Sequence, residues 1–146
     1  MRRLVASLLV LLLGAAPAAA TATFDRLPGP YPAEVLSVVD GDTLKVRVAI
    51  WLGQTVETHV RLDGLDTPEL RGKCETERDA AKAAREALGA LIGPGPVLLA
   101  DVRADKYGGR VIARVTAADG HDIAALLIAK GHGRAYGGAA RGGWCG

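Results

Sequence analysis

The chain has 146 residues, 49% of them hydrophobic, and this length and composition suit a single domain with one buried core. Its formal net charge at neutral pH is +2, and removal of an N-terminal segment that holds Arg2 and Arg3 would leave a chain with no net charge. A domain without net charge cannot bind DNA through its overall charge. Any contact with nucleic acid therefore requires a local basic patch.

The N-terminal residues have the composition of a secretory signal peptide. Two arginines precede an apolar run from Leu4 to Leu13, and small residues follow up to Ala20. The run is shorter than the roughly 20 apolar residues that a membrane-spanning helix needs, which argues against an anchor. We expect cleavage after Ala20 or Ala22, a signal peptide within residues 1–22, and a single exported domain over residues 23–146, either periplasmic or secreted.

Cys74 and Cys145 are the two cysteines of the chain. An even number of cysteines in an oxidising compartment favours a disulfide over a metal site or a catalytic nucleophile. Closing so long a loop would stabilise a small domain by about 2–5 kcal/mol.

The first half of the domain is predicted to contain three strands. A β-like run from Ala33 to Val39 ends at an Asp-Gly-Asp turn, after which residues 44–50 alternate between apolar and polar side chains. Gly53 marks the next turn, and a returning strand over residues 56–62 carries apolar side chains at every second position. The apolar tip at Trp51-Leu52 either packs on the body of the domain or touches a substrate, and we expect packing.

The returning strand leads into a short segment, residues 60–69, that is rich in charged side chains. Arg61 lies on the polar face of the strand, and the chain then breaks at Gly64 into a turn that carries Asp66 and Glu69. Carboxylate oxygens suit Ca²⁺ or Mg²⁺, and the planar fork of an arginine suits phosphate. A solvated strand end has the same composition, so this segment by itself leaves both interpretations open.

The second half is predicted to contain two helices and two further strands. Thr76 and Asp79 have the spacing of a capping box, at the start of a helix whose apolar positions are Ala80, Ala84, Leu88 and Leu91. Strands over residues 97–102 and 111–115 flank a Lys-Tyr-Gly loop. A second helix is expected to begin after Asp122 as its cap and to end at Lys130-Gly131.

This order of elements suits an α+β fold, mainly β, in which five strands form a Greek-key barrel of the OB type accompanied by two helices. Three segments, in the same order along the chain, resemble the staphylococcal nuclease-like thermonucleases. They are Val39-Asp40-Gly41-Asp42-Thr43, Arg61-Leu62 with Asp66-Thr67-Pro68-Glu69, and Asp105-Lys106-Tyr107-Gly108 with Arg110 and Ala113. The resemblance extends from about Glu34 to Gly133, which is most of the domain.

The resemblance implies a site for one Ca²⁺ ion. Asp42 and Asp66 match its side-chain ligands, and Thr67 matches a ligand that binds through its backbone carbonyl. Asp40 matches a residue that lies near these ligands without binding the ion. Glu69 matches the general base, or at least the group that orients the attacking water.

The resemblance also implies how nucleic acid is held. Arg61 and Arg110 match two phosphate-binding arginines, while Lys106, Tyr107 and Tyr136 match contacts to nucleotide phosphate and base. The loop before Arg110 contains one glycine more than the family pattern, so either Arg110 is displaced or the extra residue is absorbed as a bulge. The return of the family pattern a few residues later favours absorption.

The function implied is that of a Ca²⁺-dependent nuclease that acts as a monomer on single-stranded or breathing DNA and on RNA, and leaves 3′-phosphate ends. No stable protein partner is implied, and no membrane contact once the signal peptide is removed. The alternative is a catalytically silent OB-fold module that binds nucleic acid or a protein. Such a module would be free to lose Asp42, Glu69 or either arginine, and the chain retains all of them.

Overall fold

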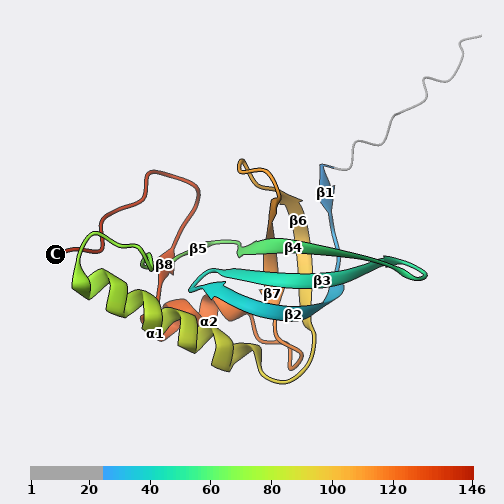
Figure 1. Cartoon of the computed structure of the whole chain (residues 1–146), viewed down its shortest axis with the longest axis horizontal. Coiled ribbons are helices and arrows are strands. Elements are labelled where there is room, and N and C mark those ends of the chain that lie inside the picture. Colours follow the sequence, from blue (N-terminus) through green and yellow to red (C-terminus); the bar gives the residue numbers. More distant parts are fainter. Residues whose placement is uncertain (1–24) are drawn as a thin grey trace, which may run out of the picture.

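The computed structural model of the protein describes residues 25–146, so the expected signal peptide lies outside the described residues. Five strands form a closed barrel (Figure 1). They are β2 (Tyr31–Asp40), β3 (Thr43–Trp51), β4 (Gln54–Leu62), β6 (Val97–Ala104) and β7 (Arg110–Thr116). Strands β2, β3 and β4 form an antiparallel meander, β4 pairs in parallel with β7, and β6 closes the barrel through antiparallel pairing with β7 and β2. The expected five-stranded OB-type barrel with two helices is confirmed.

Three strands of two residues each complete the sheet structure. Strand β1 (Arg26–Leu27) extends the barrel at β6, whereas β5 (Leu65–Asp66) and β8 (Arg134–Ala135) pair with each other. The sequence did not predict these strands, because two residues are too few to establish an alternating pattern. The pairing of β5 with β8 joins the charged turn after β4 to the C-terminal tail, residues 136–146.

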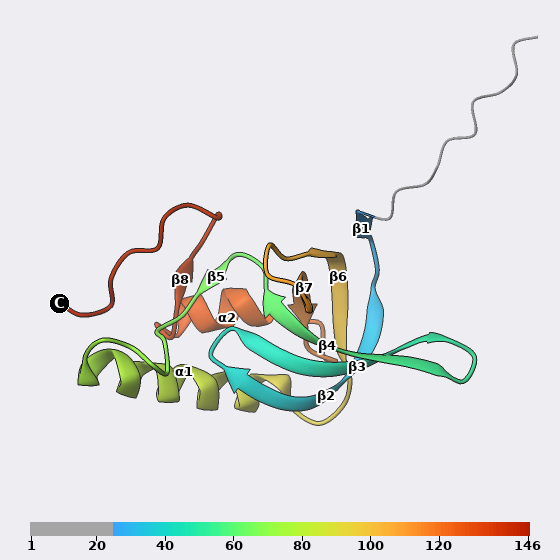
Figure 2. The same cartoon turned by 45° about the horizontal axis from the view of Figure 1, so that its top comes forward.

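The two helices lie on the same side of the barrel (Figure 2). Helix α1 (Glu75–Ile92) buries Glu77, Ala81, Ala84, Leu88 and Ile92, so its inner face includes Ala81 rather than the expected Ala80. The expected capping box at Thr76 is also wrong: the N-cap is Cys74, whose side chain is bonded to Cys145 and makes no capping hydrogen bond. Within residues 25–146, no helix combines the length and the apolar character required to cross a membrane.

Helix α2 (Ile123–Ala129) begins where the sequence predicts. The carboxylate of Asp122 accepts a hydrogen bond of 3.0 Å from the backbone N–H of Ala125, which satisfies one of the N–H groups that a helix start leaves without an intrahelical partner. Ile123 and Leu127 are fully buried and pack into the barrel core.

The β3–β4 hairpin is longer than the wall of the barrel. Leu44, Val46, Val60 and Leu62 fill the core from the half of the hairpin that belongs to the barrel, as their alternation predicts. The other half projects from the body (Figure 1), and at its tip the Trp51 and Leu52 residues are 76% and 90% exposed. The expectation that this tip packs on the barrel is wrong, because the strands carry it beyond the barrel surface.

Candidate active site

A pocket of about 460 Å³ at one end of the barrel gathers side chains from separate segments. The predicted catalytic and nucleotide-binding residues all line it, whereas the three predicted metal ligands, Asp42, Asp66 and Thr67, are buried and do not. The lining consists of Asp40, Arg61, Glu69, Asp105, Lys106, Tyr107, Arg110, Ile112, Tyr136, Gly138 and Arg141. The structure therefore brings the end of β2, the end of β4, the β6–β7 loop and the C-terminal tail to one place.

The turn between β2 and β3 positions Asp42. Its backbone N–H donates to Oδ1 of Asp40 at 3.1 Å, and the hydroxyl of Thr43 donates to Oδ1 of Asp42 at 2.9 Å. Burial raises the pKa of Asp42 to about 7, with Arg61 opposing the rise and the neighbouring charge of Asp40 adding to it. The carboxyl group is thus fixed in orientation, while its charge is poorly compensated.

The second oxygen of this carboxyl group, Oδ2, lies close to a positively charged side chain but accepts no hydrogen bond from it. Oδ2 of Asp42 lies 2.8 Å from Nη1 of Arg61, but the groups lack hydrogen-bond geometry, and among the described residues this buried oxygen has no hydrogen-bond partner. A buried carboxylate oxygen without a donor is a site that a cation would stabilise.

Gly41 allows this turn to lie directly against the turn that follows β5. A Cβ atom at Gly41 would lie 2.8 Å from Oγ1 of Thr67 and 2.8 Å from Cβ of Ala84, closer than such atoms normally approach. The absence of a side chain at this position therefore brings the backbone next to Asp42 into contact with Thr67.

Asp66 is held by two arginines from the C-terminal tail region. Its side chain is 1% exposed; Nε of Arg134 donates to Oδ2 at 3.0 Å, and Nε of Arg141 donates to Oδ1. Arg141 also donates from Nη1 to Oε1 of Glu69 and from Nη2 to the carbonyl of Thr67, the latter at 3.4 Å. A single guanidinium thus contacts both predicted ligands on this turn and the predicted base.

These contacts also act on the guanidinium itself. Partial burial lowers the pKa of Arg141, but the hydrogen bonds to Asp66 and Glu69 raise it more, so the net shift of the pKa is upward. Arg141 therefore carries a full positive charge at the carboxylates at any physiological pH.

The two predicted phosphate-binding arginines point into the same pocket. Nη2 of Arg61 donates to the carbonyl of Leu65 at 3.1 Å, and its guanidinium carbon lies 5.8 Å from the ring centroid of Tyr136. Nε of Arg110 donates to Asp105 at 2.5 Å, and its guanidinium carbon lies 5.2 Å from the ring centroid of Tyr107. Both arginines are oriented by a protein acceptor and lie near an aromatic ring.

The β6–β7 loop accommodates its additional glycine. Gly109 has a φ of +77°, a conformation that favours glycine, and it lies in the loop rather than within the β6–β7 pairing. The N–H of Asp105 donates to the carbonyl of Arg110 at 3.2 Å, and Ala113 pairs with Leu62 in the barrel. Arg110 consequently lines the pocket together with Lys106, whose Nζ lies 5.1 Å from the Tyr107 ring centroid.

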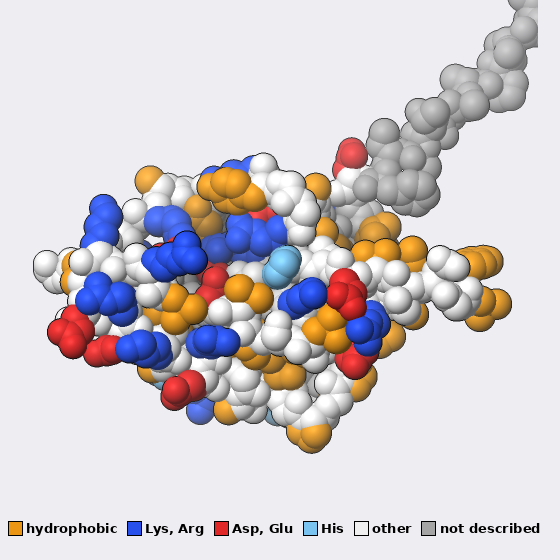
Figure 3. All heavy atoms as spheres, in the orientation of Figure 1, with side chains coloured by type: hydrophobic (Ala, Val, Ile, Leu, Met, Phe, Trp, Pro, Cys, Tyr) orange, Lys and Arg blue, Asp and Glu red, His pale blue; other side chains and the backbone are white. Residues whose placement is uncertain are grey.

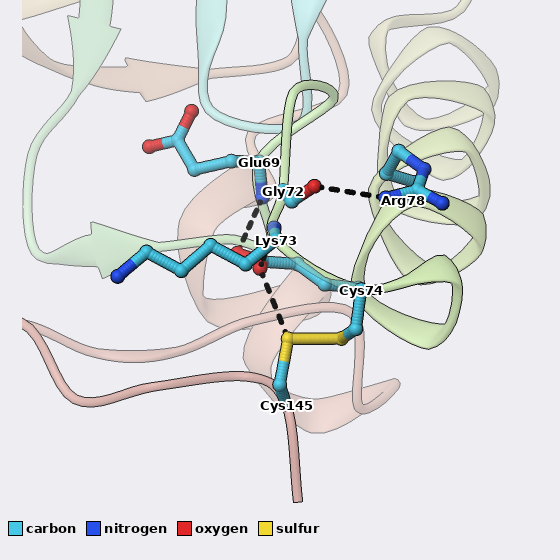
Figure 4. The surroundings of a disulfide bond; sticks show 7 residues. Glu69, Gly72, Lys73, Cys74, Arg78 and Cys145 are labelled. Atoms are coloured by element: carbon cyan, nitrogen blue, oxygen red, sulfur yellow. Dashed lines mark hydrogen bonds between the residues drawn. A yellow bond between two sulfur atoms is a disulfide. The ribbon is translucent and has the colours of Figure 1, made fainter.

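The disulfide predicted between Cys74 and Cys145 is present, with an S–S distance of 2.09 Å. Figure 4 shows that it fastens the C-terminal tail to the start of α1 beside Glu69 and Lys73. Cys74, Glu77 and Cys145 are, among residues 25–146, the one group of three potential metal-binding side chains within 4.8 Å of one another. Because the two sulfur atoms are bonded to each other and are not thiolates, this group is not a metal site.

The chemistry of the predicted ligands nevertheless fits a hard cation. The carboxylates of Asp42 and Asp66 and the carbonyl of Thr67 are all oxygen donors, the type that Ca²⁺ and Mg²⁺ bind. The oxygen of Asp42 that lacks a hydrogen-bond partner supports the fit. In this structure Arg141 supplies the positive charge at Asp66 and Glu69.

Arg134 and Arg141 are residues of the site that the sequence did not predict. Both lie in or next to a glycine-rich segment with no recognisable period, so nothing local marks them as site residues. The predicted disulfide was the available signal, because Cys74 lies five residues after Glu69 and a bond to Cys145 brings the tail to the charged turn.

The surface also shows where positive charge gathers. In Figure 3, Lys and Arg side chains are spread over the half of this face that carries α1 and the C-terminal tail, whereas hydrophobic side chains cover the tip of the β3–β4 hairpin. The neutral net charge of the domain thus coexists with a local basic surface next to the pocket.

Comparison with known protein families identifies the family of this chain. A profile described as "Staphylococcal nuclease homologue" matches residues 59–141, a segment that contains Arg61, Glu69, Arg110 and Arg141. A search among curated proteins finds no match.

Proposed function

Because the chain belongs to the staphylococcal nuclease homologue family, we propose that it is a Ca²⁺-dependent nuclease that hydrolyses DNA and RNA and leaves 3′-phosphate ends. Proteins of this family are nucleases or bind nucleic acid, and they generally depend on a metal ion. The observation that carries the proposal is the shared pocket, in which Arg61, Glu69 and Arg110 meet from separate segments of the chain.

The pocket supplies the groups that phosphodiester hydrolysis needs. Glu69, whose side chain is 51% exposed, accepts a proton from the water that attacks phosphorus. As the bond to the 5′ oxygen breaks, that oxygen leaves with the bonding electron pair and is protonated by solvent. Arg61 and Arg110 stabilise the additional negative charge on the phosphoryl oxygens, which is larger in the transition state than in the bound substrate.

The cation would be held by Asp42, Asp66 and the carbonyl of Thr67. When bound, Ca²⁺ supplies a positive charge that polarises a phosphoryl oxygen. Burial of these ligands excludes water from their oxygens and strengthens the interaction with a bound cation.

The substrate would be a strand whose bases are accessible. Tyr107, which is 59% exposed, and Tyr136 flank the arginines and offer faces on which bases can stack. Stacking depends little on base identity, so we propose little sequence preference and a preference for single-stranded or breathing nucleic acid. One chain supplies all of these residues, and we propose that the protein acts as a monomer without a stable protein partner.

Export is part of the same proposal. The composition of residues 1–22 supports a cleaved signal peptide and a mature domain that is periplasmic or secreted. The disulfide supports it independently, because such bonds persist in oxidising compartments.

A catalytically silent module that binds nucleic acid is the second candidate. The hydrogen bond from Arg141 to Glu69 favours it, because the guanidinium occupies a carboxylate oxygen that would otherwise accept a proton from water.

Cleavage of heat-denatured DNA by the purified mature chain tests the proposal, with Ca²⁺, Mg²⁺ or EGTA present and with Glu69→Gln as the matched variant. We expect cleavage that requires Ca²⁺, 3′-phosphate products, and a rate reduced about 10²- to 10⁴-fold in the variant. DNA binding without cleavage under every condition, with a folded protein by circular dichroism, would contradict the nuclease and support the binding module.

A further inference from the structure

We propose that Arg141 is an internal counter-ion of the cation site, which neutralises its oxygens until a divalent cation displaces the arginine and moves residues 137–141 of the C-terminal tail. The inference rests on the proposed function for the identity of the site. It goes further by assigning a role to a residue outside the predicted ligand set, and by making cation binding dependent on the tail.

The contacts of Arg141 coincide with the predicted cation ligands. Its guanidinium donates to Asp66, to the carbonyl of Thr67 and to Glu69, using a different nitrogen for each. Asp66 is almost completely buried, and burying a carboxylate is unfavourable unless a positive charge pairs with it. Arg141 satisfies that requirement from a segment 75 residues further along the chain.

Arginine and cation cannot bind these oxygens together. Ca²⁺ requires its oxygen ligands at about 2.3–2.6 Å, and a guanidinium that donates to the same oxygens occupies that space. The two positive charges would also repel each other at short range in a buried setting. Cation binding must therefore break the hydrogen bonds of Arg141, and its apparent affinity is lowered by the stability of those bonds.

The tail allows Arg141 to leave these oxygens while the chain keeps it close to them. Four glycines between Tyr136 and Trp144 give this loop backbone freedom. Four residues beyond Arg141, the chain is fixed by the bond from Cys145 to Cys74, a reach of at most about 14 Å. Tethering keeps the local concentration of Arg141 high, so it returns when the cation leaves.

Arg134 acts as the second fixed point of the tail. It donates to the carbonyls of Gly142 and Gly143, and its guanidinium carbon lies 4.1 Å from the ring centroid of Trp144. Arg134 also binds the other oxygen of Asp66, so it holds the tail beside that carboxylate whichever way Arg141 points.

Calorimetric titration with CaCl₂ in the absence of nucleic acid tests the proposal on the mature, disulfide-bonded chain. Arg141→Gln is compared with wild type and with Arg71→Gln, which removes the same charge from an exposed residue two positions after Glu69. We expect Arg141→Gln to bind Ca²⁺ at least about tenfold more tightly than wild type, because the cation no longer has to break hydrogen bonds between charged groups. The control should differ from wild type by less than about threefold, since an exposed charge is strongly screened.

Hydrogen exchange provides a readout independent of affinity. The proton followed is the Nε–H of Arg141, assigned in NMR spectra by its absence from Arg141→Gln. In wild type, Ca²⁺ should increase its exchange with solvent, because without the ion this group donates to Oδ1 of Asp66. Slower exchange in wild type on adding Ca²⁺ would overturn the proposal, as would equal Ca²⁺ affinities of Arg141→Gln and the control.

These outcomes separate the inference from the proposed function. A wild-type enzyme that cleaves DNA with Ca²⁺, while Arg141→Gln binds the ion no better, would overturn the role of Arg141 and leave the nuclease intact. Absence of Ca²⁺ binding in both chains, together with absence of cleavage, would overturn both.

Discussion

Replacing both cysteines with serine should lower the stability of the domain by about 4 kcal/mol. The disulfide joins residues separated by 71 positions, and the loss of chain entropy in the unfolded state on closing such a loop corresponds to about 4 kcal/mol at 25 °C. The folded state should change little, because Arg134 donates to the carbonyls of Gly142 and Gly143 and Arg141 donates to Asp66, so these contacts hold the tail in place without the bond. The loss is a large fraction of the 5–15 kcal/mol that typically stabilises a domain.

Urea unfolding at 25 °C measures this loss. With a slope of about 1–3 kcal/mol per molar urea, the midpoint of the Cys74→Ser/Cys145→Ser chain should fall by about 1–4 M. Wild type treated with a reductant should behave in the same way, which separates the loss of the bond from any effect of the serines. A decrease below about 1 kcal/mol would refute the reasoning, because the folded tail would then also gain freedom when the bond is lost, or the unfolded chain would already be compact.

Two further predictions concern residues that shape the site and its surroundings. Gly41→Ala should lower the free energy of unfolding by about 1–3 kcal/mol, measured with urea, and weaken Ca²⁺ binding, measured by calorimetry. The reason is that the added Cβ would lie 2.8 Å from Oγ1 of Thr67. If neither value changed, the close approach would be contradicted. The pKa of Asp63 is lowered, mainly because Arg103 donates hydrogen bonds to it at 2.7 and 3.0 Å. This pair therefore stabilises the fold above about pH 4, and the stabilisation is lost as the pH falls through the pKa that Asp63 has in the folded state. Arg103→Gln should therefore make the thermal midpoint less dependent on pH between 2.5 and 5. The effect should stay below about 1 kcal/mol, because the pair is partly exposed. Parallel plots of thermal midpoint against pH for the two chains would show that the pair contributes nothing.

Local patterns were sufficient to predict the barrel and both helices. Residues 44–50 and 56–62 alternate, and alternation specifies a strand with one buried face wherever the strand lies in the barrel wall. The same pattern failed at Val56 and at the tip near Trp51, because alternation does not reveal where the barrel ends. The helix start was misjudged for a similar reason: Thr76 has the spacing of a cap, but the disulfide at Cys74 lies at the N-cap position.

The sequence by itself determined the family, the fold class, the cysteine pair and the residues that could perform the chemistry. It could do so because residue type and order along the chain limit which oxygen, guanidinium and aromatic groups are available. Only the tertiary structure decided how those groups are paired. Arg134 and Arg141 reach Asp66 across 68 and 75 residues, and Asp42 is buried beside Arg61. Burial and long-range charge pairing depend on packing in three dimensions, and no local pattern of residues encodes them.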